Sequence, residues 1–362
     1  MKTEIIKLYA DNIDMDKLRY AAQVIRDGGL VAFPTETVYG LGANALNEEA
    51  VRKTFEVKGR PPDNPLIAHI ACKDDIKIVS KVALEGYVKK LTDEFWPGPL
   101  TLIMEKTDRV PYITTAGLDT VAVRMPSHPV AMALIKESGV PISAPSANSS
   151  GKPSPTRAEH VIKDLSGKID VIIDSGETTV GLESTVLDIT TWPPVILRPG
   201  GITPSQLSRV LGTVEIDPAI TAKGSGNTNY TPKSPGLKYK HYSPEAEVIV
   251  IEGRPSAVAG EIIRMAKHYI EKGLKVGIMA TEQTKNFYYD DDIICQNTEI
   301  ILLGDREKPE TIAANLFRAL REFDNRRVKV VLAEAVESTG IGLAIMNRLN
   351  KAAGYNIINV GW

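Results

Sequence analysis

Residues 30–45 read LVAFPTETVYGLGANA. The apolar run Leu30–Phe33, closed by Pro34, predicts a short buried strand. Gly40–Ala45 also fits the loose dinucleotide-binding pattern GxGxxA, which follows a strand. The interval Pro34–Tyr39 is too long for the tight first turn of that pattern. We therefore expect a structural glycine turn here and not a nicotinamide site.

Helices and strands are expected to alternate on both sides of this stretch. Asp14–Arg26 carries apolar residues at helical spacing and ends before Gly28-Gly29, and a second helix is expected over Asn47–Val57. Further strands are expected at Leu66–Ile70, Leu100–Met104, Thr120–Val123, Ile169–Ile173 and Thr185–Ile189. Further helices are expected over Ser127–Glu137 with a serine cap, after a capping-box pattern at Thr156–Glu159, and from Pro204 to Gly212. This pattern indicates an α/β domain over residues 1–212.

Regular periodicity stops in residues 213–245, where prolines and glycines accumulate. The segment is longer than a plain connection requires and carries the stretch Lys238–Tyr242, which mixes cations, histidine and tyrosine. We expect a linker that serves as an active-site lid. Packing of these residues between two domains is the simpler alternative.

A second domain is expected over residues 246–362. Buried apolar runs such as Val248–Ile251 and Val276–Met279 alternate with amphipathic helices, for example Thr311–Phe323. Such alternation predicts a parallel, doubly wound, Rossmann-like sheet.

The composition excludes several classes of protein. Forty-three Lys and Arg stand against 45 Asp and Glu, a formal net charge of −2, which does not favour strong direct binding to nucleic acid. Cys72 and Cys295, the only two cysteines, cannot build a disulfide framework, and they favour a reducing cytoplasm. No apolar run approaches the roughly 20 residues of a membrane helix. The five histidines have no metal-ligand spacing, and no Ser-His-acid group can be argued.

Four cations lie where strands or helices end. Lys58 and Arg60 follow the second helix and could bind phosphate, although basic residues at a helix C-terminus also complement its dipole, and spacing alone favours that simpler interpretation. Arg124 ends an apolar strand, where a carboxylate site and an ordinary surface arginine are about equally expected. Arg198 ends another strand. The polar loop 143–156 leads into a helix N-terminus, a common place for anions.

Several motifs in order resemble the YrdC threonylcarbamoyladenylate synthase family in its long, two-domain form. The matching blocks are Phe33–Gly42, Lys58-x-Arg60, Asp63–Leu66, Trp96–Thr101, Ala144–Asn148, Gly181–Val186, Leu197–Gly200 and the linker stretch Ser234–Pro244. Many long forms carry Met where this chain has Leu237, which is a change that conserves volume.

The resemblance implies a twisted, mixed or mostly parallel sheet in the first domain and a nucleotidyltransferase activity. Threonine, bicarbonate or CO2, and ATP with its Mg²⁺ would give threonylcarbamoyl-AMP and pyrophosphate, without a tightly bound organic cofactor or a protein nucleophile. The product would pass to downstream threonylcarbamoyl-transferase machinery that acts on tRNA. Two other classes compete: a double-stranded RNA-binding module, and an O-carbamoyltransferase of the hydrogenase-maturation type. The net charge speaks against the first, and the lack of cysteine zinc motifs against the second.

The resemblance also implies roles for single residues. The expected threonine contacts are Thr35, His69, Arg124, Ser143 and Ser184. The expected ATP contacts are Lys58, Arg60, Thr120, Ser146, Asn148, Ser154, Arg198 and His241, with Lys58 and Arg60 as the catalytic pair.

Overall fold

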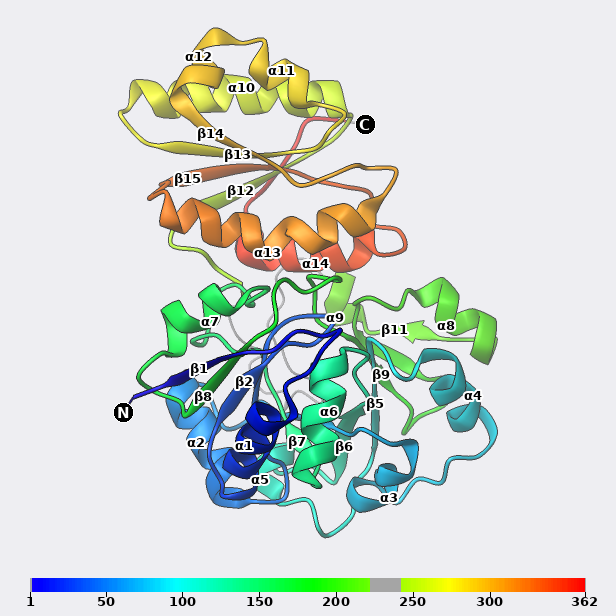
Figure 1. Cartoon of the computed structure of the whole chain (residues 1–362). Coiled ribbons are helices and arrows are strands. Elements are labelled where there is room, and N and C mark those ends of the chain that lie inside the picture. The colour runs from blue at the N-terminus through cyan, green and yellow to red at the C-terminus, as the bar shows by residue number, and fades with distance from the viewer. Residues whose placement is uncertain (1, 222–241, 362) are drawn as a thin grey trace. The chain divides into compact units, whose positions relative to one another are not determined.

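The computed structural model describes residues 2–221 and 242–361, which form two compact units. Unit 1 comprises Met1–Ser150 and Ser154–Tyr239, and unit 2 comprises Gly151–Pro153 and Lys240–Trp362 (Figure 1). Most of the expected lid, including His241, lies outside the described residues. The domain boundaries at 212 and 245 therefore stay a prediction.

Unit 1 is built on an 11-stranded mixed sheet. Its order is β1-β8-β2-β3-β7-β4-β6-β5-β9-β10-β11. Five of the neighbouring pairs are parallel and five are antiparallel, which confirms the mixed sheet. The strands are β1 Glu4–Lys7, β2 Val31–Phe33, β3 Gly40–Asn44, β4 Ile67–His69, β5 Leu100–Glu105, β6 Thr120–Arg124, β7 Ile142–Ser143, β8 Val171–Asp174, β9 Thr185–Asp188, β10 Val195–Arg198 and β11 Glu215–Ile216.

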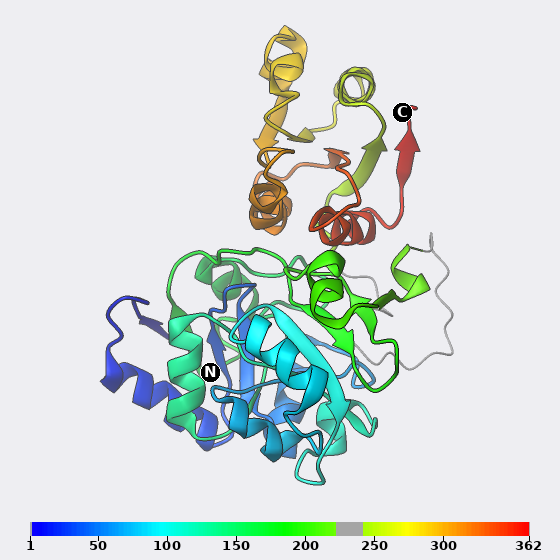
Figure 2. The same cartoon turned by 90° about the vertical axis from the view of Figure 1, so that its right-hand side faces the viewer.

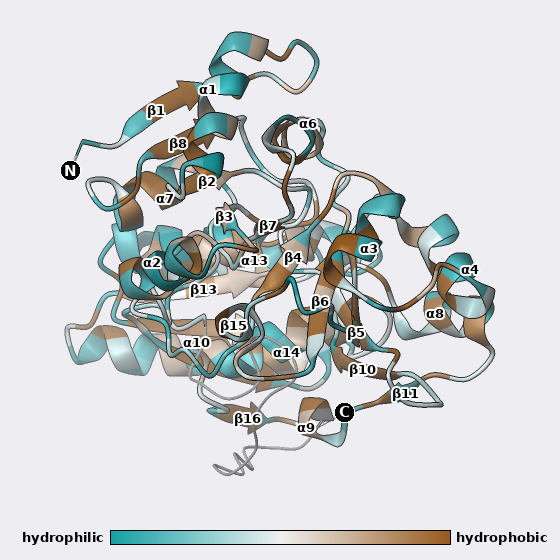
Figure 3. Ribbon diagram, turned by 90° about the horizontal axis from the view of Figure 1, so that it is seen from below, coloured by the Kyte–Doolittle hydropathy of each residue, from teal (hydrophilic) through white to brown (hydrophobic). Residues whose placement is uncertain are grey.

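Helices cover both faces of this sheet. The helices of unit 1 are α1 Met15–Arg26, α2 Glu48–Lys58, α3 Ile76–Val79, α4 Gly86–Phe95, α5 Tyr112–Thr115, α6 Pro129–Ser138, α7 Ala158–Leu165, α8 Pro204–Leu211 and α9 Pro218–Thr221, with a 3₁₀ turn at Lys73–Asp75. Phe33 packs with α1 and α6, whereas Ala32, its neighbour in β2, packs with α2 and α7. Because side chains alternate along a strand, these are the two opposite faces of the sheet. Strands β6 and β8 are mostly hydrophobic, but β6 ends at Arg124 and β8 ends at Asp174 (Figure 3).

The structure corrects the glycine turn expected at residues 40–45. Gly40–Asn44 is strand β3, which pairs antiparallel with β2, and the turn is the segment between them. The glycine at position 42 is needed for packing, since a Cβ there would lie 2.8 Å from Phe33 Cε1 and 2.9 Å from Ile142 Cγ2. The pattern that resembles a dinucleotide motif therefore reflects close contact between strand and side chains.

The starts of three helices can be compared with the sequence pattern. The predicted caps of α6 and α7 are wrong, and the predicted start of α8 is confirmed. Helix α6 is capped by His128, whose Nδ1 accepts the Val130 N–H at 3.2 Å, and not by the serine before it. Helix α7 begins after Arg157 without a side-chain cap, so the capping-box pattern at Thr156 does not form. Helix α8 begins at Pro204, as expected, and ends at Gly212.

Unit 2 contains a five-stranded sheet with order β14-β13-β15-β12-β16. All four strand pairs are parallel. Its strands are β12 Glu247–Glu252, β13 Val276–Ala280, β14 Thr298–Leu302, β15 Val330–Glu334 and β16 Ile357–Asn359. Its helices are α10 Pro255–Glu271, α11 Lys285–Tyr289, α12 Asp292–Asn297, α13 Pro309–Asn325 and α14 Gly342–Ala352.

Helices α10 to α12 lie on one face of this sheet, and α13 and α14 lie on the other (Figure 1). The parallel, doubly wound arrangement is thus confirmed. Figure 2 shows the red β16 beside the yellow-green β12, at one edge of the sheet. Within the described part of the chain, no helix is both long and apolar enough to cross a membrane.

Candidate active site

Three neighbouring strands place His69, Thr101 and Arg124 in one row. His69 on β4 pairs with Arg124 on β6, and Arg124 pairs with Thr101 on β5. Residues directly opposite each other in a sheet point to the same face. The Oγ1 of Thr101 lies 2.8 Å from the Oγ of Ser184, which precedes β9. The sheet therefore brings three of the expected threonine contacts together: His69, Arg124 and Ser184.

Arg124 is buried and ion-paired in this row. Its Nη2 lies 2.7 Å from Oε1 of Glu36, and its Nε donates to the carbonyl oxygen of Gly98 at 3.3 Å. Arg124 and Glu36 are 4% and 7% exposed. Among the described residues, none accepts a hydrogen bond from Nη1 of Arg124, so this nitrogen is available to an anion.

His69 contributes a neutral ring beside that charge. Burial, and secondly the positive charge of Arg124, lower the pKa of His69 to about 3. Its Nδ1 lies 3.1 Å from the carbonyl oxygen of Ile67, and its ring meets Phe33 edge-on at 6.4 Å between centroids. At neutral pH Arg124 is therefore the charged member of this pair.

Thr35 and Ser143 are placed differently. The Oγ1 of Thr35 donates to the Val38 carbonyl at 2.6 Å and lies 2.7 Å from Oγ1 of Thr37, so it closes the turn between β2 and β3. Ser143 pairs with Ala68, one residue before His69, and its Oγ donates to the Ala43 carbonyl at 3.3 Å. By strand alternation its side chain points to the opposite face from His69. Any contact of Ser143 with a ligand beside Arg124 would use its main chain.

The expected phosphate contacts gather where α2 ends. Nζ of Lys58 donates to the carbonyl oxygens of Ser146 and Asn148, and the Lys58 carbonyl accepts the Ser150 N–H at 2.8 Å. Arg60 donates from Nε and Nη2 to the carbonyl oxygens of Asn64, at 3.3 Å, and Pro65, at 3.2 Å. Ser146 also bridges to Gly40 on β3. The structure therefore joins Lys58 to the 146–150 loop.

Arg198, another expected ATP contact, binds Ser184, whose hydroxyl contacts Thr101 in the row of His69, Arg124 and Thr101. Its Nε donates to the Ser184 carbonyl and its Nη2 to the Ser184 Oγ, both at 3.1 Å. Ser154 donates to Oε1 of Glu183 at 2.5 Å, one residue before Ser184. Thr120 is separate: it begins β6 and pairs with Glu105, four residues and about 13 Å of strand from Arg124.

Sequence reasoning missed Glu36, Thr101 and Glu183. The signal for Glu36 is a carboxylate in a turn of hydroxyl and apolar residues directly after a buried strand. Its partner Arg124 comes much later in the chain, so no local pattern reveals the pair. Among the described residues, no group of three or more His, Cys, Asp or Glu could hold a metal ion.

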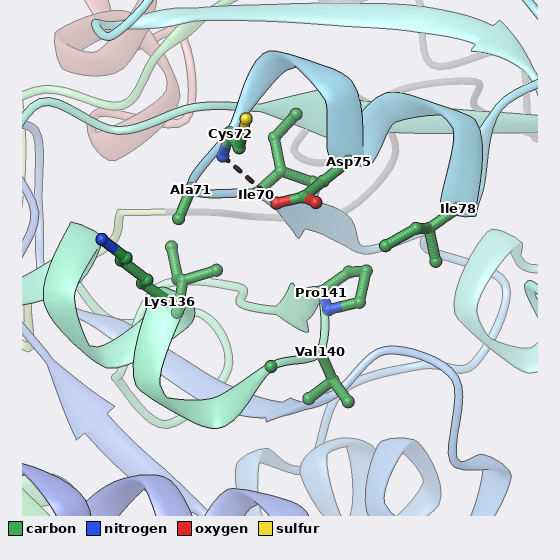
Figure 4. A pocket seen from close by; sticks show the side chains of 10 residues that line it. Ile70, Ala71, Cys72, Asp75, Ile78, Lys136, Val140 and Pro141 are labelled. Atoms are coloured by element: carbon green, nitrogen blue, oxygen red, sulfur yellow. Dashed lines mark hydrogen bonds between the residues drawn. The ribbon is translucent and has the colours of Figure 1, made fainter.

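Two cavities in unit 1 lie elsewhere. One, of about 460 Å³, opens beside the C-terminal end of α6 and is lined by Cys72, Asp75 and Lys136 among others (Figure 4). There Asp75 accepts the Cys72 N–H at 3.2 Å. The other, of about 480 Å³, is lined by Tyr9 and Arg157 among others. Neither is lined by an expected site residue.

Two family models match successive parts of the chain. The one described as "Telomere recombination" (Sua5/YciO/YrdC) matches residues 23–200. The one described as "Threonylcarbamoyl-AMP synthase, C-terminal domain" (Sua5_C) matches residues 202–354.

Similar proteins span nearly the whole chain. The chain is 52% identical over 350 residues to the threonylcarbamoyl-AMP synthase of Pyrococcus abyssi, covering 97% of this chain and 98% of that protein. It is 49% identical to the threonylcarbamoyl-AMP synthase of Bacillus subtilis, covering 94% of each. The crystal structure of P. abyssi Sua5 complexed with L-threonine matches with a TM-score of 0.90 and 52% identity, over 99% of this chain and 100% of that one.

Proposed function

The chain belongs to the Sua5/YrdC family of threonylcarbamoyl-AMP synthases, and we propose that it makes L-threonylcarbamoyl-AMP from L-threonine, bicarbonate or CO2, and ATP, with release of pyrophosphate. The observation that carries this proposal is 52% identity to such a synthase over almost the full length of both chains. The row of Arg124, His69 and Ser184 is consistent with it.

The proposed threonine subsite follows from charge. A buried arginine with one free N–H edge suits a carboxylate, because a charge-assisted hydrogen bond offsets the loss of solvation. Nη1 of Arg124 would bind the threonine carboxylate. The hydroxyl of Ser184 and the neutral ring of His69 lie in the same row and would contact the rest of the amino acid.

The proposed reaction has two steps. The neutral amine of threonine attacks the carbon of CO2, one C=O electron pair moves to oxygen, and the nitrogen then releases a proton to solvent, which leaves a carbamate. A carbamate oxygen then attacks the α-phosphorus of ATP, and the bond to the β-phosphate oxygen breaks with its electron pair on pyrophosphate. The positive charges of Lys58, Arg60 and Arg198 would stabilise the negative charge of the phosphates. The reaction needs no covalent intermediate on the protein.

The remaining contacts belong to the same proposal. Ser146, Asn148 and Ser154 would bind the nucleotide together with Thr120 and His241, and Mg²⁺ would enter as part of the ATP substrate. The cluster around Lys58 supports the first two. A threonylcarbamoyl transferase acting on tRNA would consume the product. A cytoplasmic location fits the two free cysteines, both exposed.

The test is a direct synthesis assay. The full chain is incubated with MgATP, L-threonine and ¹⁴C-bicarbonate, and the products are separated by chromatography. We expect a labelled adenylate and one pyrophosphate for each adenylate formed. Pyrophosphate release without threonine, or label that never joins AMP, would contradict the proposal.

A further inference from the structure

The guanidinium group of Arg124 is held at two of its three nitrogen atoms. Nε donates to the Gly98 carbonyl, and Nη2 lies 2.7 Å from Oε1 of Glu36. The angles between Nη2 and Oε1 fall outside those of a hydrogen bond, so the contact is an ion pair. Two anchored nitrogens define the plane and the direction of the third. Nη1 is the guanidinium nitrogen that remains available to a ligand.

Glu36 is itself anchored at its side chain and at its main chain. Its Oε2 accepts the Ser127 N–H at 3.2 Å, where the chain leaves β6. Its main-chain oxygen accepts the Val180 N–H at 2.8 Å and the Thr179 hydroxyl at 3.3 Å. One carboxylate oxygen therefore accepts from Ser127 and the other contacts Nη2 of Arg124. The contact with Arg124 is made at a single nitrogen, which leaves Nη1 outside the pair.

The charges point to the same role. A buried arginine without a partner is costly, and Glu36 offsets that cost. His69, which pairs with Arg124 across the sheet, is neutral at pH 7. It therefore does not compete with Arg124 for the carboxylate of Glu36. Glu36 therefore stabilises the charged group while leaving its outer edge unoccupied.

We infer that Glu36 is a positioning residue, which orients Arg124 so that Nη1 faces the carboxylate of the amino-acid substrate. This inference rests on the proposed threonine subsite. It assigns to Glu36 an effect on threonine affinity through Arg124, without contact between Glu36 and the substrate.

The experiment compares Glu36→Gln with the wild-type full chain in the adenylate assay. We expect the KM for L-threonine to rise about tenfold or more, because a charged anchor is lost. The KM for ATP and the kcat should change less than about twofold, because the nucleotide contacts are untouched. In an Arg124→Lys background, Glu36→Gln should add little to the loss, since the two residues act as one unit.

Unit 2 offers a matched control. Arg306, which is partly buried, lies 2.9 Å from the fully buried Glu334, and neither is an expected site residue. Glu334→Gln should destabilise its own unit but leave the threonine KM unchanged. An equal rise in threonine KM in both variants, or equal effects on threonine and ATP in Glu36→Gln, would overturn the positioning role.

A second variant covers the case in which Glu36→Gln does not fold. Glu36→Asp keeps the charge but shortens the side chain, and its threonine Kd is measured by calorimetry. We expect weaker binding than in the wild type, and an unchanged Kd would overturn the inference. If the wild type makes the adenylate and the Glu36 variants bind threonine as tightly as it does, only the inference about Glu36 is refuted. If the wild type makes no adenylate, the proposed function is refuted.

Discussion

Arg198 holds Ser184 at two points, with Nε on the serine carbonyl and Nη2 on the serine hydroxyl, each at 3.1 Å. Lysine cannot reproduce this fork. We expect Arg198→Lys to lower kcat/KM about tenfold or more while the fold is retained. Steady-state kinetics alongside circular dichroism will show this, and Arg209→Lys on helix α8 is the surface control. Equal kinetics in Arg198→Lys and wild type would contradict the assigned contact.

Lys58 and Arg60 should be required for pyrophosphate release. Removal of either charge by substitution with alanine should cost about 10²-fold or more in rate, because the phosphates lose a preorganised cation. Lys58→Ala also removes the bonds to Ser146 and Asn148, so its melting temperature is measured in parallel. Lys53→Ala, on the same helix, is the control. Folded variants that turn over at the wild-type rate would exclude the catalytic assignment.

Arg124 should determine threonine affinity. Arg124→Lys keeps the charge but loses the planar group that contacts both Gly98 and Glu36. We therefore expect the threonine KM to rise by about tenfold or more and the ATP KM to stay near that of the wild type. Titration of threonine at saturating ATP measures the first value. A threonine KM equal to that of the wild type would remove Arg124 from the subsite.

His69 should make the protein less stable in mild acid. Its pKa in the folded state is lowered to about 3, below the ordinary value near 6.5 that it has when unfolded. The unfolded state therefore binds more protons between these values, so this contribution is fully present above pH 6.5 and is lost as the pH falls toward 3. The slope is at most about 1.4 kcal/mol per pH unit. Urea unfolding of wild type and His69→Gln at pH 7, 6 and 5 should show a shallower decline in the variant, and parallel declines would contradict this.

Two glycines should respond oppositely to alanine. At Gly42 a Cβ would lie within 3 Å of Phe33 and Ile142, so Gly42→Ala should destabilise by about 1–3 kcal/mol. Gly260 lies exposed within α10 with nothing near its added Cβ, so Gly260→Ala should stabilise by about 0.5–1 kcal/mol. Thermal unfolding of both variants measures the difference. A Gly42→Ala protein as stable as the wild type would contradict the packing that we describe.

Local patterns predicted most elements, and their failures have physical causes. The helices over α1, α2 and α8 carry clear stop or cap residues. The two glycines of β3 predict a turn, because glycine ordinarily marks turns, whereas in the structure they leave room for the ring of Phe33. The sequence pattern does not reveal strands β14 and β16, because none of their residues is fully buried.

The site was predictable as a set of residues but not as an arrangement. Motif resemblance supplied Arg124, His69 and Ser184, and strand pairing brings them together. The Glu36–Arg124 pair depends on how the turn between β2 and β3 packs against β6, and the orientation of Ser143 depends on sheet register. A local sequence pattern encodes neither.

The order of strands in unit 1 also constrains how the protein acquires its activity during synthesis. The row of His69, Arg124, Thr101 and Ser184 is drawn from strands β4, β6 and β5 and from the residue before β9, and Arg198 ends β10. Such non-local pairing closes late, because each long loop must be ordered before its contact forms. A nascent chain that has emerged from the ribosome only as far as β8 has Arg124 but neither Ser184 nor Arg198. While still attached to the ribosome, such a chain would hold only part of the binding site, and it would become able to bind substrate only when β9 and β10 join the sheet.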